Sequence, residues 1–185
     1  LNMLNMRYII YNPDQAPIRN PYAFGNAWFV DKLDMVDNAD AEIEALNTID
    51  PLETAVVDKR FQKELEGFVP QKDSTATIVL EEYRPNRLTY KSKADKEQLA
   101  VFSEVYYQPG WKATVDGKEV PHFRADWILR GMRVPAGEHT IVFEFRPSGY
   151  VTAAYVSSYS SFLILLLLIA AIGWSGWKYW KKSKN

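Results

Sequence analysis

Five side chains in the second half of the chain have types and spacing suited to binding a sugar. Trp111 follows a Pro-Gly turn and begins an alternating segment, so its indole offers a flat platform on which a sugar ring can stack. The other four lie together on one predicted connection before a strand: Arg124, Asp126, Trp127 and Arg130. Their guanidinium and carboxylate groups can hydrogen-bond to sugar hydroxyls.

Each of these side chains also has a structural interpretation, which we favour at this point. An indole such as that of Trp111 buries a large apolar area when it packs in a core. An arginine and an aspartate on one connection can form a bidentate pair that fixes a loop. The sequence therefore leaves sugar binding by the five residues open beside a role in packing and loop structure.

The remaining polar residues predict no catalytic, cofactor or metal site. The two histidines, His122 and His139, lie at strand edges without partners at ligand spacing, whereas zinc needs three or four converging ligands. Asp31, Asp34 and Asp37 lie close together and are interpreted as a solvated face. The sequence has no Gly-rich phosphate loop, no nucleophile elbow, no basic patch and Cys 0, and its net charge of -1 does not suggest a nucleic-acid partner.

An uncharged apolar run near the C-terminus is the element that anchors the chain. The segment from about Tyr159 to Tyr179 matches the roughly 20 residues that a helix needs to cross a bilayer. Tyrosines and tryptophans flank it, as at membrane–water interfaces. Lys178 lies next to its end, and Lys181, Lys182 and Lys184 follow it. By the positive-inside rule we expect a cytoplasmic C-terminus and an extracytoplasmic domain before the helix.

The composition allows one such helix and one soluble domain. The 185 residues have a mean hydropathy of -0.28, which is too polar for a multi-pass protein. No signal-peptide pattern follows Leu1. An extracytoplasmic domain needs an upstream segment to carry it across the membrane, so we expect the chain to be the C-terminal piece of a longer membrane protein.

Short segments of strand character recur before the apolar run. They are residues 6–11, 27–30, 54–57, 75–83, 87–92, 98–106, 111–115, 118–120, 128–134 and 139–146. A short helix is expected from Asp37 or Asn38 to Leu46, a polar turn at 93–96, and a type I′ hairpin turn at Asp116-Gly117.

This pattern predicts a mainly-β fold: an antiparallel β-sandwich with a short helix, followed by one C-terminal transmembrane α-helix. The expected parts are an extracytoplasmic sandwich-like domain over residues 1–147, the joint and transmembrane helix over 148–180, and a basic cytoplasmic tail over 181–185.

One stretch carries a resemblance to a known family. It runs from Tyr106 to Lys118 (YYQPGWKATVDGK) and continues through Phe123–Asp126, Arg130-Gly131, Val134–His139 and Phe143–Phe145. This stretch resembles the C-terminal part of the YfhO-type bacterial membrane proteins, and residues 1–10 resemble that family's entry into the same domain. Family members are long multi-pass proteins related to glycosyltransferases that use polyprenyl-phosphate sugars on the outer side of the membrane.

The resemblance implies that catalytic carboxylates lie in early extracytoplasmic loops, so no catalytic residue is carried over to this chain. The expected function is an accessory domain and last span of such a glycosyltransferase-like protein in the bacterial cytoplasmic membrane. The expected partners are membrane lipid, an upstream transmembrane region, and an envelope glycan or polyprenyl-phosphate sugar. The alternative is a non-catalytic, membrane-anchored module that binds carbohydrate or protein.

Overall fold

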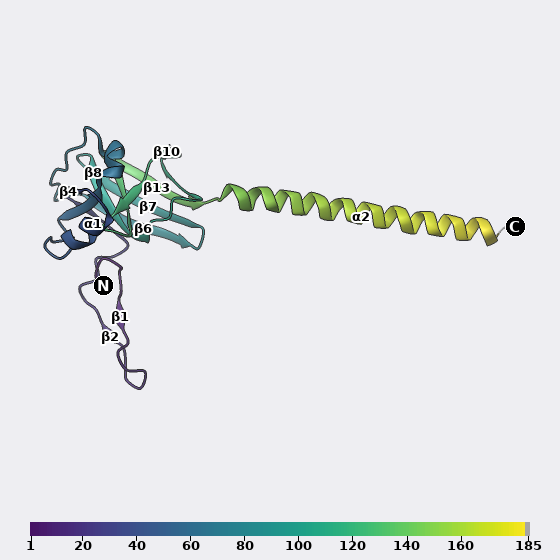
Figure 1. The fold of residues 1–185 in the computed structure, drawn as a ribbon, viewed down its shortest axis with the longest axis horizontal. Helices are drawn as coiled ribbons and strands as arrows, with labels where there is room; N and C mark the ends of the chain where they lie inside the picture. The colour runs from purple at the N-terminus through teal and green to yellow at the C-terminus, as the bar shows by residue number, and fades with distance from the viewer. Residues whose placement is uncertain (184–185) are drawn as a thin grey trace. The chain divides into compact units, whose positions relative to one another are not determined.

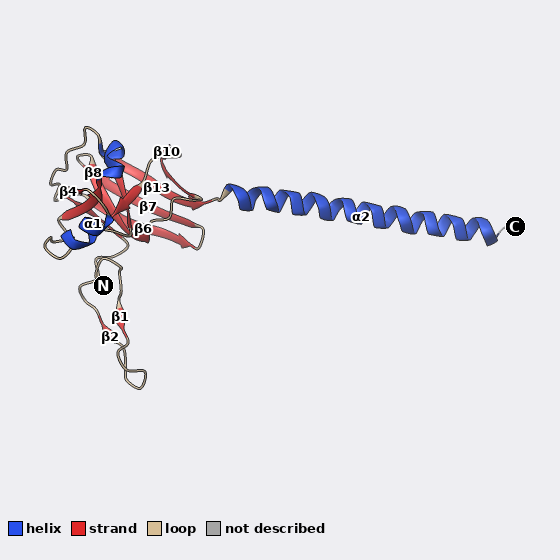
Figure 2. Cartoon of the chain, in the orientation of Figure 1, coloured by secondary structure: helices blue, strands red, loops and turns tan. Residues whose placement is uncertain are grey.

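The computed structural model describes residues 1–183, which form a β-rich unit and a unit with one long helix (Figures 1 and 2). The first unit is Leu1–Phe145, and the second begins at Arg146. Lys184 and Asn185 of the expected basic tail lie outside the described residues. The boundaries and membrane sides assigned to the three parts from the sequence stay predictions.

The larger sheet has five antiparallel strands in the order β10-β9-β13-β7-β6. They are β6 (Thr77–Arg84), β7 (Arg87–Ala94), β9 (Trp111–Val115), β10 (Lys118–Val120) and β13 (Gly137–Phe145). The strands β9 and β10 are joined by the Asp116-Gly117 turn, whose φ angles are 50° and 81°. Positive φ at both residues is what a type I′ turn requires, so the hairpin prediction is confirmed.

The smaller sheet has four antiparallel strands in the order β11-β12-β8-β3. They are β3 (Ala27–Val30), β8 (Gln98–Val105), β11 (Phe123–Ala125) and β12 (Leu129–Val134). Strand β8 lies inside this sheet, and its first five residues are buried. That burial explains why it reads as a continuous apolar run rather than an alternating one.

Successive residues of β8 point into two different cores. Leu99 and Val101 belong to a cluster that includes Ala55 and Val57 of the neighbouring strand β5 (Thr54–Asp58). Ala100 and Phe102 belong to a second cluster, with Tyr90, Phe143 and other residues of the five-stranded sheet. The four-stranded sheet therefore has a core on each face, because side chains alternate along a strand.

Three strands were missing from the sequence prediction. They are β2 (Ile18–Arg19), which pairs with β1 (Tyr8–Ile9), β4 (Lys32–Val36) and β11. Strand β4 pairs with β5 in parallel, so a small parallel pair joins the antiparallel sheets. The turn expected at 93–96 was placed too early, since β7 continues through Ala94.

Two short helices complete the β-rich unit: α1 (Ala39–Ala45) and the 3-10 helix η1 (Lys59–Leu65). Helix α1 begins where the sequence predicts, because the Asn38 side-chain oxygen accepts a hydrogen bond from the backbone N of Ala41 at 2.9 Å. A short helix among antiparallel sheets confirms the predicted mainly-β fold class.

The second unit is the helix α2 (Ser148–Ser183). Its stretch Thr152–Lys181 has a mean hydropathy of 2.1 and is long and apolar enough to cross a membrane. The leucines and isoleucines of this stretch are exposed, as expected for a helix that meets lipid rather than a protein core.

Candidate functional site

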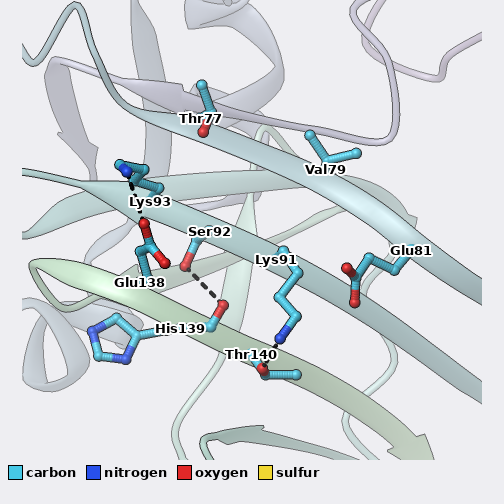
Figure 3. A pocket seen from close by; sticks show the side chains of 9 residues that line it. All are labelled: Thr77, Val79, Glu81, Lys91, Ser92, Lys93, Glu138, His139 and Thr140. Atoms are coloured by element: carbon cyan, nitrogen blue, oxygen red, sulfur yellow. Dashed lines mark hydrogen bonds and ion pairs between the residues drawn. The ribbon is translucent and has the colours of Figure 1, made fainter.

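The outer face of the five-stranded sheet carries a polar groove of about 480 Å³ (Figure 3). It is lined by Thr77, Val79, Glu81, Lys91, Ser92, Lys93, Glu138, His139 and Thr140. Both lysines of the groove already have partners: Lys93 Nζ lies 2.7 Å from Glu138 Oε1, and Lys91 Nζ donates to Thr140 Oγ1 at 2.7 Å. Without an aromatic platform or a free buried charge, this groove is the weaker candidate.

A second hollow of about 420 Å³ contains two of the residues singled out from the sequence. We call it the Trp111 hollow; its lining is Pro85, Glu104, Val105, Tyr107, Trp111, Arg130 and Phe145. Three of these seven side chains are aromatic and two are charged. This mixture of flat apolar faces and a few polar groups is typical of sites for small ligands.

Strand pairing brings the two aromatic walls of the hollow together. Trp111 begins β9 and Phe145 ends β13, and the two residues lie opposite each other in the sheet. Their ring centroids are 5.3 Å apart. Tyr107 lies on the connection before β9 and is more than half exposed, so this residue can be substituted without disturbing a core.

An irregularity in the other sheet directs the charged residues. Between Leu129 and Arg130 the register with β8 shifts, so that Leu129 pairs with Val105 and Arg130 with Phe102. The extra residues of β8 at this point include Glu104. Such bulges turn side chains out of the regular alternation, and here Arg130 and Glu104 both line the hollow.

Arg130 is a buried charge with an unused donor. Only 2% of its surface is exposed. Its Nε donates to the Val105 carbonyl oxygen at 3.1 Å, and its guanidinium carbon lies 4.1 Å from the centroid of the Trp111 ring. Its Nη1 has no hydrogen-bond partner among residues 1–183. A buried donor without a partner is costly, so a ligand that brought a hydrogen-bond acceptor to this closed-off atom would relieve that cost.

Glu104 is the acidic counterpart of Arg130 in the hollow. Burial raises the pKa of its carboxyl group, and the charge of Arg130 partly offsets this. Burial likewise lowers the pKa of Arg130. Behind them the Tyr90 hydroxyl is buried without a partner in the described part of the chain. The hollow thus offers a donor, an acidic group and aromatic faces, a combination suited to a hydroxylated ring.

The other three predicted residues lie elsewhere, around the loop between β11 and β12. Arg124 pairs with Arg130 across these strands, but its side chain contacts Glu42 at 2.5 Å and Asp58 at 3.7 Å. Glu42 is fully buried and also accepts a hydrogen bond from the Trp127 backbone N at 2.9 Å. The favoured structural role of Arg124 agrees with these contacts, although its partner is Glu42 rather than the neighbouring Asp126.

Asp126 and Trp127 form the bend of this loop. Their φ angles are 50° and 71°, which non-glycine residues adopt only when their surroundings hold them there. Asp126 Oδ1 accepts from the Val56 backbone N at 2.8 Å, and burial raises the pKa of Asp126 to about 7. Trp127 remains partly exposed. Asp126 is therefore a support of the loop, while Trp127 is accessible but separate from the Trp111 hollow.

A family comparison matches residues 58–157 with the family described as bacterial membrane protein YfhO. This is 100 of the 185 residues. The chain belongs to the YfhO family. The family prediction drawn from residues 106–145 is confirmed. No curated protein and no solved structure matches the chain.

The part matched to the YfhO family contains the whole Trp111 hollow and the beginning of α2. Glu42, the buried partner of Arg124, lies outside it. Sequence reasoning singled out neither Glu104 nor Tyr107 as a site residue, because Glu104 belongs to no motif and Tyr107 entered only as part of the stretch that resembles the family. Their position is a further signal: Glu104 lies near the end of β8, and Tyr107 lies between β8 and the Pro-Gly turn before Trp111.

Proposed function

We propose that this chain is an accessory domain and membrane span of a larger YfhO-family protein, and that its Trp111 hollow binds an envelope glycan. Aromatic faces beside an unpaired guanidinium N–H are the observation that carries the proposal. A sugar ring presents apolar C–H groups to such a face and hydroxyl oxygens to such a donor. The hollow would guide an acceptor glycan, while the chemistry takes place upstream.

The glycosyltransferase part of this proposal rests on the resemblance of residues 106–145 to the family. Transfer from a polyprenyl-phosphate sugar needs space for the lipid tail and a carboxylate positioned at the acceptor hydroxyl. The helix α2 contains no acidic residue, and the Trp111 hollow contains one carboxyl group. A parent protein that lacks residues 1–147 but inserts its other spans normally should lose transfer to the acceptor while still binding the donor.

The sidedness of the domain is proposed from the lysines at the end of α2. Lys178 and Lys181 lie at the C-terminal end of the apolar stretch, and positively charged ends stay in the cytoplasm. Residues 1–147 would then be extracytoplasmic and residues 181–185 cytoplasmic. A reporter that is active only in the cytoplasm, fused after Asn185, should be active. An inactive but normally expressed fusion would refute this orientation.

Glycan binding is tested with purified chain in detergent and with oligosaccharides released from a bacterial envelope. Tyr107→Ala removes an exposed ring from the hollow and should leave the melting temperature unchanged. A lost aromatic contact is worth about 0.5–1.5 kcal/mol, so we expect affinity to fall about twofold to twelvefold. Trp127→Ala is the matched control, because it removes a partly exposed aromatic ring outside the hollow. Equal losses in both variants would contradict the assignment of the site.

A further inference from the structure

The N-terminal arm, residues 7–22, exposes several large apolar side chains to solvent. It contains the two-residue strands β1 and β2 and the loop between them (Figure 1). Its large apolar side chains, each more than half exposed, are Tyr8, Ile10, Tyr11, Ile18 and Tyr22. Five such side chains within 16 residues form a patch of the kind that marks an interaction surface.

The base of the arm is fixed to the domain. Asn20 Nδ2 donates to the Met6 carbonyl oxygen at 2.8 Å and to Asn2 Oδ1 at 3.0 Å. Beneath it, Ser103 Oγ of strand β8 lies 2.7 Å from the carbonyl oxygens of Met3 and Gly25. The arm is therefore held at its origin by β8, while its outer part contains one short pair of strands, which is marginal in water, and a few local hydrogen bonds between residues 11 and 15.

The charges of the arm indicate the partner. Arg7 and Arg19 have no ion-pair partner among the described residues, and Asp14 is the one acidic residue of the arm. Tyrosines, isoleucines and unpaired arginines together are the composition of segments that lie in the headgroup region of anionic bilayers. A bilayer is at hand, because the same chain carries α2 and belongs to a membrane protein family.

We infer that the N-terminal arm docks on the surface of an anionic bilayer, with its tyrosines and isoleucines among the headgroups and its two arginines beside lipid phosphates. This contact is separate from the glycan site and does not depend on it. It gives the domain a second attachment to the membrane besides α2.

The absence of cysteine from the sequence makes the test direct. A single Ile10→Cys in the full chain is labelled with an environment-sensitive fluorophore and reconstituted in nanodiscs that contain phosphatidylglycerol. Val79→Cys is the matched control, since Val79 is an exposed residue on the outer face of β6. We expect the label at position 10, but not at 79, to be quenched by nitroxide-bearing lipid and protected from aqueous iodide.

Charge dependence provides the second readout. An arginine near an anionic surface favours the bound state about fivefold, so Arg7→Gln and Arg19→Gln should each lower the ratio of docked to undocked arm about fivefold. A label at position 10 that iodide quenches as strongly as at 79 would overturn the inference. Protection from both quenchers would also overturn it, because protein, including a second copy of the chain, would then cover the arm. If the label at position 10 disturbs folding, Tyr22→Cys gives the same test.

Discussion

The pair of Arg124 and Glu42 should be among the most costly polar contacts of the domain to break. Glu42 is fully buried, and the Arg124 side chain is 17% exposed, so water screens their attraction only weakly. In Arg124→Met the Glu42 carboxylate stays buried and loses its closest cation. Breaking a buried pair in this way costs about 3–5 kcal/mol. A domain of this size has a free energy of unfolding of about 5–15 kcal/mol, so the Arg124→Met variant loses a large share of its stability.

The reverse substitution should cost less. Glu42→Gln retains a side-chain oxygen for the Trp127 backbone N, and Arg124 keeps Asp58 at 3.7 Å. We expect a loss of about 1–3 kcal/mol, the range for one hydrogen bond to a charged group. The double variant Arg124→Met/Glu42→Gln contains no unpaired Glu42 charge. It should therefore lose less than the sum of the two single variants, with a coupling of about 1–3 kcal/mol.

The assay is urea unfolding of the chain truncated after Pro147, and tryptophan fluorescence monitors the unfolding. Both apolar clusters have all their buried members between Trp28 and Phe143, so this shortened chain should fold alone. For a domain near 150 residues, a loss of about 3–5 kcal/mol in the free energy of unfolding corresponds to a decrease of about 9–15 °C in Tm. An Arg124→Met loss below about 1 kcal/mol would refute the reasoning, since that is the value of an exposed pair.

Three further substitutions test other parts of the fold. Gly131→Ala should destabilise by about 1–3 kcal/mol in urea unfolding, because a Cβ there would lie 2.5 Å from a buried Phe123 ring atom. Trp111→Ala should lower Tm by about 9–15 °C, since truncating a packed aromatic costs about 3–5 kcal/mol; an unchanged Tm with lost glycan binding would make Trp111 a binding platform alone. The hydrogen bond from His139 to Asp116 raises the pKa of His139 above its ordinary value of about 6.5. Its stabilisation is complete below that value and lost as pH rises through the folded-state pKa, so His139→Gln should flatten the fall in urea midpoint above pH 6.

The parts of the fold that sequence reasoning found depend on local rules. Asn38 caps α1 by its own side chain, and Asp116-Gly117 needs positive φ at both residues whatever surrounds it. Strand β4 was missed because Asp34 and its neighbours resemble a solvated face. Its parallel pairing with β5, about 20 residues further on, is not a local property.

The candidate site was found only in part, for the same reason. Trp111 and Arg130 were singled out separately. The packing of the two sheets places the guanidinium carbon of Arg130 4.1 Å from the centroid of the Trp111 ring. The buried partner of Arg124 is Glu42, 82 residues away, and the sequence analysis did not single out Glu42 at all. Glu104 reaches the Trp111 hollow through an irregular register, which no pattern of residue types reveals.

The position of β13 has a consequence for the order in which the domain folds. This strand is the last of the β-rich unit in the sequence, yet it lies in the middle of the five-stranded sheet and joins the β6-β7 hairpin to the β9-β10 hairpin. The two hairpins can form early during synthesis, because their contacts are local. They stay unconnected until residues 137–145 have been made, and α2 begins three residues later. Completion of the sheet and delivery of the membrane helix are therefore nearly simultaneous steps in the biogenesis of this chain.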